Sequence, residues 1–199
     1  MAPILLTGFQ PFGSNAVNPT MLLMERLAGT EGVVTATLPV EYGTAGDAFE
    51  DLLDKHEPAA VLCFGLAAKT DVLLVERVAW NRDTTEQADN TGLVRQGVAI
   101  LDDAPPSYPC GFPVPMLVEA LAGAGVPVDV SDDAGGYVCN HLYFRALHAV
   151  AMRGLDTPVA FVHVPPLPEH CTDRTGGLAF ERLEAGVRAL IEAARAAVA

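Results

Sequence analysis

The chain has 199 residues and a formal net charge of −13 at pH 7. Half of its residues are hydrophobic and 19% are charged, a balance that is typical of a globular protein and excludes a largely disordered one. Nucleic acids and anionic membranes bind clusters of Lys and Arg, and the 12 residues of these types are spread along the chain, so we expect neither as a partner.

Short β-branched runs alternate along the chain with segments of helical periodicity. The predicted strands are Ile4–Thr7, Val33–Val40, Ala59–Gly65, Leu73–Trp80, Val126–Ser131 and Pro158–Val164. The predicted helices are Pro19–Ala28, Thr44–His56, Val114–Ala122, Asn140–Met152 and Phe180–Val198. Asn18 is expected to cap the first helix, and Gly154 to follow the end of the fourth. This alternation predicts one α/β domain over residues 1–199, a three-layer α/β/α sandwich with a twisted, mostly parallel or mixed central sheet.

The segment Asn81–Gly111 does not follow this alternation. It is polar, rich in Asp, Gly and Pro, and has little periodicity. Connections of that length are uncommon in compact domains and are usually functional or mobile. We therefore predict that this segment covers a site and moves when substrate binds.

The four cysteines are irregularly spaced, and no CxxC motif or paired Cys/His spacing indicates a metal site. The N-terminus MAPILLTG lacks the basic region and the long apolar run of a signal peptide. No stretch approaches the roughly 20 apolar residues that span a bilayer. We expect a cytoplasmic protein with free thiols and without cofactor or metal.

Cys139 is the strongest candidate nucleophile. Gly135 and Gly136 permit an unusual turn before it, and the predicted fourth helix begins directly after it. The partial positive charge of a helix N-terminus favours the thiolate, and free backbone N–H groups there can bind an oxyanion. A buried structural cysteine fits this segment about as well. Cys63, inside the apolar run AAVLCFG, is predicted to be a core thiol.

A cysteine nucleophile needs a base and a group that orients the base. His163 ends the apolar strand VAFVHV, and sites often form at such strand ends. Glu76 interrupts the apolar run VLLVERVAW. A core histidine and an exposed glutamate on an edge strand are competing interpretations of these two residues. His141 and His148 do not match a metal pair and are predicted to be packing or surface residues.

Several motifs are shared with one known family. LLTGFQPFG, VNPT, VERVAWN, DNTG, GGYVCNH and FVHVPPLPE follow one another over nearly the whole chain. In this order and at these intervals they resemble the pyroglutamyl peptidase I family, also called pyrrolidone-carboxylate peptidases, which are cytosolic cysteine peptidases. The resemblance implies an α/β/α fold akin to the nucleoside phosphorylases and removal of N-terminal pyroglutamate from peptides through a thioester intermediate. It also implies a homo-oligomer, tetramer or dimer, that uses no metal.

The resemblance assigns roles to individual residues. Its catalytic triad falls on Glu76, Cys139 and His163, which are also the three residues selected above on chemical grounds. The substrate pocket that it implies is formed by the residues Phe9, Phe12, Tyr137 and Val138, together with the position of Leu66.

Two positions depart from the family pattern. Leu66 stands where relatives commonly carry Gln, and Glu86 where they frequently carry Arg. Lys69, Arg77 or Arg82 could take over the role of that Arg. Because both departures concern the pocket and its covering segment, a cysteine amidase or aminopeptidase of altered N-terminal specificity stays open as an alternative. A phosphorylase-like enzyme is a more distant alternative, since the sequence has no phosphate-binding loop.

Overall fold

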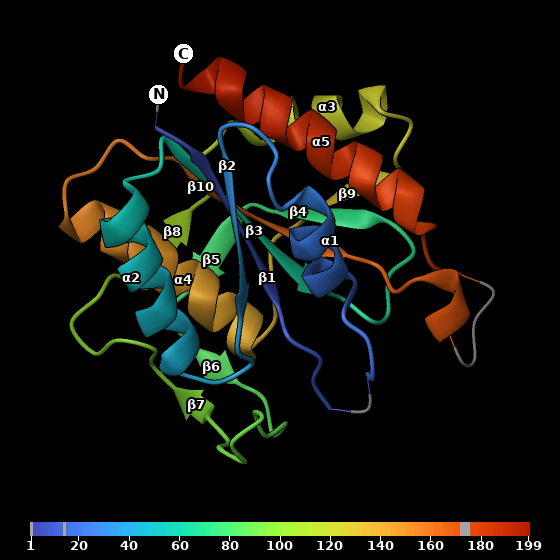
Figure 1. Cartoon of the computed structure of the whole chain (residues 1–199). Helices are drawn as coiled ribbons and strands as arrows, with labels where there is room; N and C mark the ends of the chain where they lie inside the picture. Colours follow the sequence, from blue (N-terminus) through green and yellow to red (C-terminus); the bar gives the residue numbers. More distant parts are fainter. Residues whose placement is uncertain (1, 14, 172–175) are drawn as a thin grey trace.

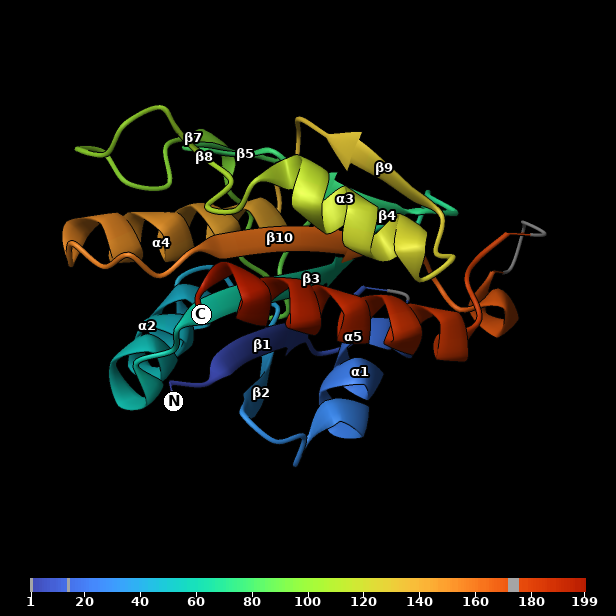
Figure 2. The same cartoon turned by 90° about the horizontal axis from the view of Figure 1, so that it is seen from above.

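The computed structural model describes residues 2–13, 15–171 and 176–199. A six-stranded sheet in the order β2-β1-β3-β10-β4-β9 lies between two layers of helices (Figures 1 and 2). Its strands are β1 (Ile4–Phe9), β2 (Val33–Leu38), β3 (Ala60–Leu66), β4 (Leu73–Glu76), β9 (Val128–Ser131) and β10 (Val159–Val164). The helices are α1 (Pro19–Leu27), α2 (Thr44–His56), α3 (Val114–Gly123), α4 (Val138–Met152) and α5 (Phe180–Ala197), with a 3-10 turn η1 (Pro168–His170). The predicted α/β/α class is confirmed.

Neighbouring strands of this sheet run parallel except for β10 and β4, which are antiparallel. The register sets His163 of β10 opposite Gly65 of β3 on one side and opposite Leu74 of β4 on the other. Continued by one residue, the β10–β4 register brings Glu76 level with Phe161. Because alternate residues of a strand share a face, Glu76 and His163 are diagonal neighbours on the same face of the sheet.

Each face of the sheet has its own hydrophobic core. Apolar side chains of α1, α3 and α5 cover one face, and those of α2 and α4 cover the other. Buried residues of the second core include Phe161 of β10 and Cys63 of β3. The face that carries Glu76 and His163 is therefore the one on which α4 packs.

Two of the local signals that the sequence predicts are present, one at the start of α1 and one after the end of α4. The side chain of Asn18 accepts a hydrogen bond from the backbone N–H of Thr20 at 3.1 Å, and Pro19 follows as the first helical residue of α1. Gly154, just beyond α4, has a φ of +62°, a conformation that favours glycine.

Several predicted boundaries are wrong by two residues or more, and two of them bear on the site. The run Leu73–Trp80 is not one strand: β4 ends at Glu76, and β5 (Val78–Trp80) pairs with β8 (Ser107–Pro109) outside the main sheet. The chain leaves the main sheet at Arg77, whose carbonyl accepts from the backbone N–H of Cys110 at 2.8 Å. Helix α4 begins at Val138, two residues earlier than predicted, so Cys139 lies inside its first turn.

The segment Asn81–Gly111 is held by short ladders and side-chain hydrogen bonds. Besides β8 it contains β6 (Asp83–Thr84), which pairs with β7 (Gln96–Val98). The buried carboxylate of Asp89 accepts from the backbone N–H groups of Tyr42 at 2.9 Å and of Leu93 at 2.9 Å. These hydrogen bonds hold the segment in one conformation, although its sequence lacks the periodicity of a helix or a strand. Movement of this segment on substrate binding stays a prediction.

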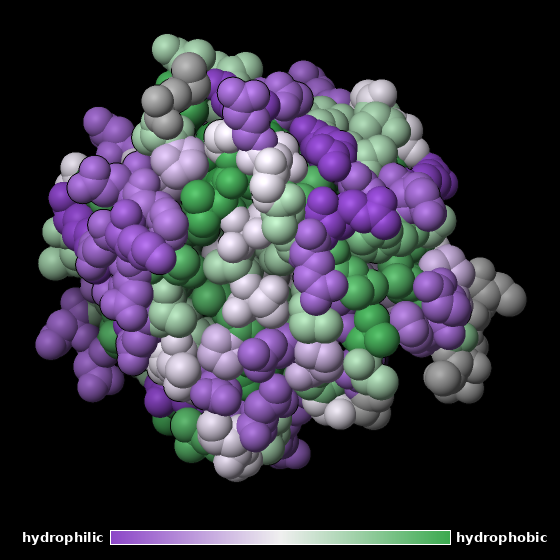
Figure 3. Space-filling view, in the orientation of Figure 1, coloured by the Kyte–Doolittle hydropathy of each residue, from purple (hydrophilic) through white to green (hydrophobic). Residues whose placement is uncertain are grey.

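Figure 3 shows hydrophilic and hydrophobic residues interspersed on the face seen in Figure 1. None of the helices in the described part of the chain has the length and apolar character that crossing a membrane requires.

Candidate functional site

A buried carboxylate–imidazole pair lies beneath the N-terminus of α4. Nδ1 of His163 is 2.7 Å from Oε1 of Glu76. Glu76 is completely buried and His163 is 7% exposed. Because β4 lies between β10 and β9, Glu76 is not the exposed residue of an edge strand that the competing interpretation required. A carboxylate on Nδ1 fixes the ring orientation and leaves Nε2 for a reacting group.

Cys139 faces this pair from the first turn of α4. Tyr137 is the N-cap residue, and no side chain within the described residues caps the helix, so the backbone N–H groups of the first turn stay available to an anion. Gly65 makes room for the thiol: a Cβ atom at that position would lie 2.8 Å from Sγ of Cys139. The half-buried thiol is therefore held between the helix N-terminus and the ends of β3 and β10.

The protonation of His163 reflects its neighbours. Burial alone would lower the pKa of His163, but its hydrogen bonds and charge interactions with Cys139 and Glu76 outweigh burial and raise the pKa to about 10. The imidazole is thus protonated at neutral pH in the resting site. An imidazolium between a carboxylate and a thiol is the arrangement that cysteine hydrolases use to hold a thiolate.

This raised pKa predicts how stability depends on pH. The folded-state pKa of His163 lies above its ordinary value of 6.5, so its contribution to the free energy of unfolding is fully present below pH 6.5 and is lost as pH rises through about 10. We expect the free energy of unfolding to fall over this range by at most about 1.4 kcal/mol per pH unit. Urea titrations of the wild type and His163→Gln measure it. Parallel pH dependences of the two proteins would contradict the assignment.

The three side chains open into a cavity of about 780 Å³. Its lining residues are Phe12, Gly13, Asn15, Leu66, Ala67, Ala68, Lys69, Leu74, Glu76, Gln87, Asp133, Ala134, Gly135, Tyr137, Cys139 and His163. A much smaller recess adjoins it and shares Cys139 with it, and its lining residues are Phe9, Phe12, Asn18, Val40, Leu66, Tyr137, Val138 and Cys139. We call this recess the apolar slot. All five residues predicted to form the substrate pocket line the slot.

The two departures from the family pattern have different positions. Leu66 is 7% exposed and lines both the cavity and the slot. Glu86 lines neither of them, and its carboxylate accepts from Nε2 of Gln96 at 3.0 Å. Arg77 pairs with Asp132. Of the three proposed substitutes, Lys69 is the one that lines the cavity.

Other candidates lie in different surroundings. Cys63 is completely buried, and burial raises its pKa to about 12, which confirms a core thiol. Nδ1 of His148 lies 2.9 Å from the hydroxyl of Tyr108. His141 is neither simple packing nor a surface residue, because its Nδ1 is 3.0 Å from a carboxylate oxygen of buried Asp83.

Sequence reasoning did not select Asn18 or Gly65 as site residues. Asn18 was recognised as a helix cap, and the same completely buried side chain also lines the apolar slot. Gly65 stood at the end of an apolar run. The signal that could have found it is a glycine at the end of a central strand, which often marks a close approach of another group.

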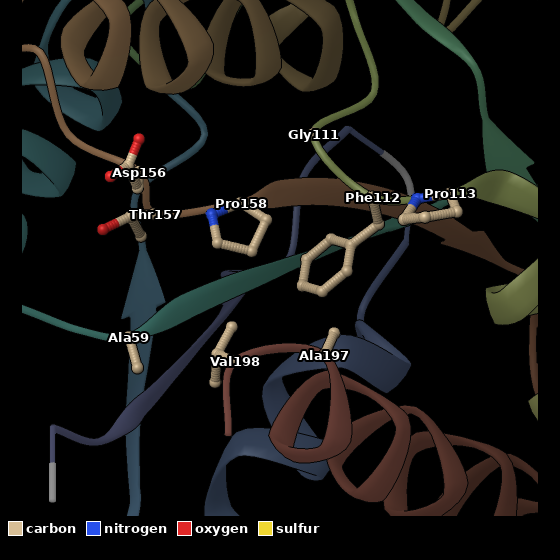
Figure 4. A pocket seen from close by; sticks show the side chains of 9 residues that line it. All are labelled: Ala59, Gly111, Phe112, Pro113, Asp156, Thr157, Pro158, Ala197 and Val198. Carbon is tan, nitrogen blue, oxygen red and sulfur yellow. The ribbon is translucent and has the colours of Figure 1, made fainter.

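A second cavity, of about 610 Å³, lies at the opposite end of the sheet, where β3 and β10 begin. Figure 4 shows the ring of Phe112 there, between Pro158 and Ala197. Among the described residues that line this cavity, Asp156 is the only titratable one. This cavity therefore lacks the set of titratable side chains that acid–base or nucleophilic chemistry requires. Over the described ranges of the chain, no group of three or more His, Cys, Asp or Glu residues is arranged to hold a metal ion.

Comparison with known proteins places this site in a family. Residues 2–198 match the family model described as pyroglutamyl peptidase. The pyrrolidone-carboxylate peptidase of Cupriavidus taiwanensis is 37% identical over 98% of this chain and 93% of its own length, and that of Bacillus cytotoxicus is 33% identical over the same shares.

Solved structures agree with the sequence matches. The pyroglutamyl peptidase I of Bacillus amyloliquefaciens superposes with a TM-score of 0.93 at 28% identity, covering 97% of this chain and 94% of that one. The pyrrolidone carboxyl peptidase of Pyrococcus furiosus gives 0.95 at 29% identity, covering 99% and 100%. Sequence and fold agree over nearly the full length, and the chain belongs to the pyroglutamyl peptidase family.

Proposed function

We propose that this protein is a cysteine exopeptidase that removes N-terminal pyroglutamate from peptides and proteins. The observation that carries the proposal is the buried pair of Glu76 and His163, with Nδ1 and Oε1 2.7 Å apart, at a half-buried Cys139 beside an apolar slot. Cys139 acts as nucleophile, His163 as general acid and base, and Glu76 orients the imidazole.

The reaction has two halves. The thiolate of Cys139 attacks the pyroglutamyl carbonyl carbon, and the oxyanion that forms is bound by N–H groups of the first turn of α4. The protonated His163 then gives its proton to the departing amine, the C–N bond breaks and a thioester remains. In the second half, neutral His163 takes a proton from water, which attacks the thioester and releases free pyroglutamate and the thiolate.

The lining of the slot suits the acyl group, but its volume of about 10 Å³ holds no more than a water molecule, so binding requires the slot to widen. Pyroglutamate is a small, uncharged lactam without a free amine, so apolar and aromatic walls with a few polar groups suffice to bind it. Phe9, Phe12 and Tyr137 provide aromatic walls, and the side chain of Asn18 provides a polar edge. The cavity beyond Cys139 leaves space for the rest of the peptide.

The test is hydrolysis of pyroglutamyl-aminomethylcoumarin by wild type, Cys139→Ala and Cys63→Ala. We expect a loss on the order of 10³-fold or more for Cys139→Ala, because the nucleophile is removed. Cys63→Ala, the matched thiol control, should stay active since Cys63 lies in the core away from the cavity. Wild-type protein without activity, or equal losses in both variants, would contradict the proposal.

The residue at position 66 leaves a second substrate specificity open. Leu66 makes the slot more apolar than a Gln at that position would. The same triad could then prefer another N-terminal group, either a blocked one or, as in an aminopeptidase, one with a free amine. Prolyl and N-acetyl-alanyl coumarin amides, assayed beside the pyroglutamyl substrate, distinguish the two: faster turnover of either one would assign the altered specificity.

The remaining expectations rest on the sequence and on the resemblance. A homo-oligomer, tetramer or dimer, is proposed from the resemblance, and light scattering of the purified protein would measure its mass. A cytoplasmic location and one folding domain over residues 1–199 are proposed from the sequence pattern, and cell fractionation and the cooperativity of unfolding would test them.

A further inference from the structure

Two buried polar residues that the proposed chemistry does not use follow directly after Cys139. Asn140 is completely buried and His141 is 4% exposed. Both belong to the first turns of α4, and both side chains reach residues 80–83, the segment that follows Glu76 by a few positions. Buried polar groups are costly unless bonded, so this arrangement calls for an explanation.

Asn140 fastens the nucleophile's helix to that segment through three bonds. Its Oδ1 accepts from the backbone N–H of Trp80 at 3.0 Å. Its Nδ2 donates to the carbonyl oxygens of Trp80 and Arg82, both at 2.9 Å. The side chain of Asn140 thus bonds both N–H and carbonyl groups of this backbone segment and fixes the distance of the segment from α4.

His141 adds a buried charged cluster. The carboxylate of Asp83 is completely buried, with Oδ2 3.0 Å from Nδ1 of His141. The same Oδ2 accepts from Nε of Arg95 at 2.6 Å. Arg95 directly precedes β7 and also donates to the carbonyl of Ala99 at 2.8 Å. The buried carboxylate holds both partners in place, because losing either one removes a hydrogen bond from a group that water does not reach.

The cluster connects to the apolar slot through contiguous rings. The imidazole of His141 packs edge-on against Tyr42, with centroids 5.3 Å apart. Tyr42 packs edge-on against Tyr137 at 5.7 Å, and Tyr137 lies against Phe12 at 5.8 Å. Tyr137 and Phe12 both line the slot. A shift of His141 would therefore be transmitted both to the turn that carries Cys139 and to the slot wall.

We propose that Asp83 and His141 are positioning residues of the active site. Their buried hydrogen bond fixes the first turn of α4 against the segment that follows Glu76, and so holds Sγ of Cys139 against His163. The expected effect of these residues on turnover rests on the proposed function. Their expected effect on the reactivity of the Cys139 thiol rests on the geometry alone.

The experiment compares His141→Leu with His141→Asn. Asparagine can place an amide N–H near the position of Nδ1 and keep the bond to Asp83, whereas leucine cannot. We expect His141→Leu to slow alkylation of Cys139 by iodoacetamide and to lower kcat for pyroglutamyl-aminomethylcoumarin, each by about tenfold or more, since small misplacements of reacting groups cost up to roughly 10²-fold. KM should change less than kcat, and His141→Asn should recover most of both losses.

A control on the same helix separates positioning from stability. His148→Leu also removes a partly buried hydrogen bond, that to Tyr108 at 2.9 Å, but far from Cys139 along α4. It should lower Tm without slowing alkylation. If His141→Leu fails to fold, the same measurements are made on Asp83→Asn. This variant keeps an acceptor for the imidazole but removes the charge, so we expect smaller losses of alkylation rate and kcat.

Three results would overturn the proposal. They are unchanged alkylation in His141→Leu, equal impairment of His141→Asn and His141→Leu, and an equal effect of His148→Leu on alkylation. A wild type that alkylates rapidly at Cys139 but does not hydrolyse the pyroglutamyl substrate would contradict the proposed function instead, while the alkylation comparison would still decide the role of His141.

Discussion

Glu76→Gln should lower kcat by a factor on the order of 10⁴ while leaving the protein folded. Glutamine has the size of glutamate, so the buried space stays filled. It lacks the charge, however, and its amide N–H₂ can turn toward Nδ1 of His163, which Oε1 of Glu76 now contacts at 2.7 Å. An amide donor on Nδ1 selects the tautomer with a proton on Nε2, which cannot accept one from Cys139 or water.

The same substitution removes one of the causes that raise the pKa of His163. The pH profile of the residual kcat/KM should therefore shift to lower pH on its basic side. Glu86→Gln is the matched control, because this exposed carboxylate accepts from Gln96 and lines neither the cavity nor the slot. Its kcat should stay within about twofold of the wild type. An active Glu76→Gln protein would mean that another group orients His163.

The sequence predicted the layers well because strand and helix periods differ clearly in this chain. Every predicted helix and every strand of the main sheet is present. The run Leu73–Trp80 shows where this reasoning ends. Its apolar residues continue past Arg77, so periodicity cannot reveal that the chain leaves the main sheet there. That departure depends on pairing of β5 with β8, some thirty residues later in the chain, which no local pattern encodes.

Each candidate catalytic residue could be selected from the sequence, but their meeting in one site could not be predicted from it. Glu76 and His163 stood out because each interrupts an apolar strand, yet they are 87 residues apart in the sequence. Their meeting follows from the antiparallel insertion of β4 beside β10, which the sequence pattern does not specify. The order of the family motifs supplied the grouping that spacing could not.

His141 was misjudged for a related reason. Comparing it with His148 tested only pairs on one helix, seven residues apart. Its partner, Asp83, comes from the polar segment 58 positions earlier that had no recognisable period. A buried ion-pair partner contributed by an irregular segment is the kind of contact that single-sequence reasoning misses.

Gly65→Ala should abolish most activity through a single methyl group. A Cβ atom at this position would stand 2.8 Å from Sγ of Cys139 and 2.8 Å from Cζ of Phe161. Such distances are well inside van der Waals contact, and Phe161 is completely buried, so it cannot turn away. We expect overpacking to cost about 1–3 kcal/mol of stability. We also expect displacement of the thiol to lower kcat by roughly 10²-fold or more.

A second substitution separates the two effects. In Gly65→Ala/Phe161→Leu the smaller side chain relieves the contact with Phe161, so Tm should partly recover, but kcat should not, because the contact with Cys139 persists. Gly123→Ala in α3 is the control, since a Cβ there meets nothing within 4 Å and alanine favours a helix. Activity that returned together with Tm would show that Gly65 serves the packing of β3 alone. Stability without activity would show that the close approach of the strand to the thiol is what the reaction requires.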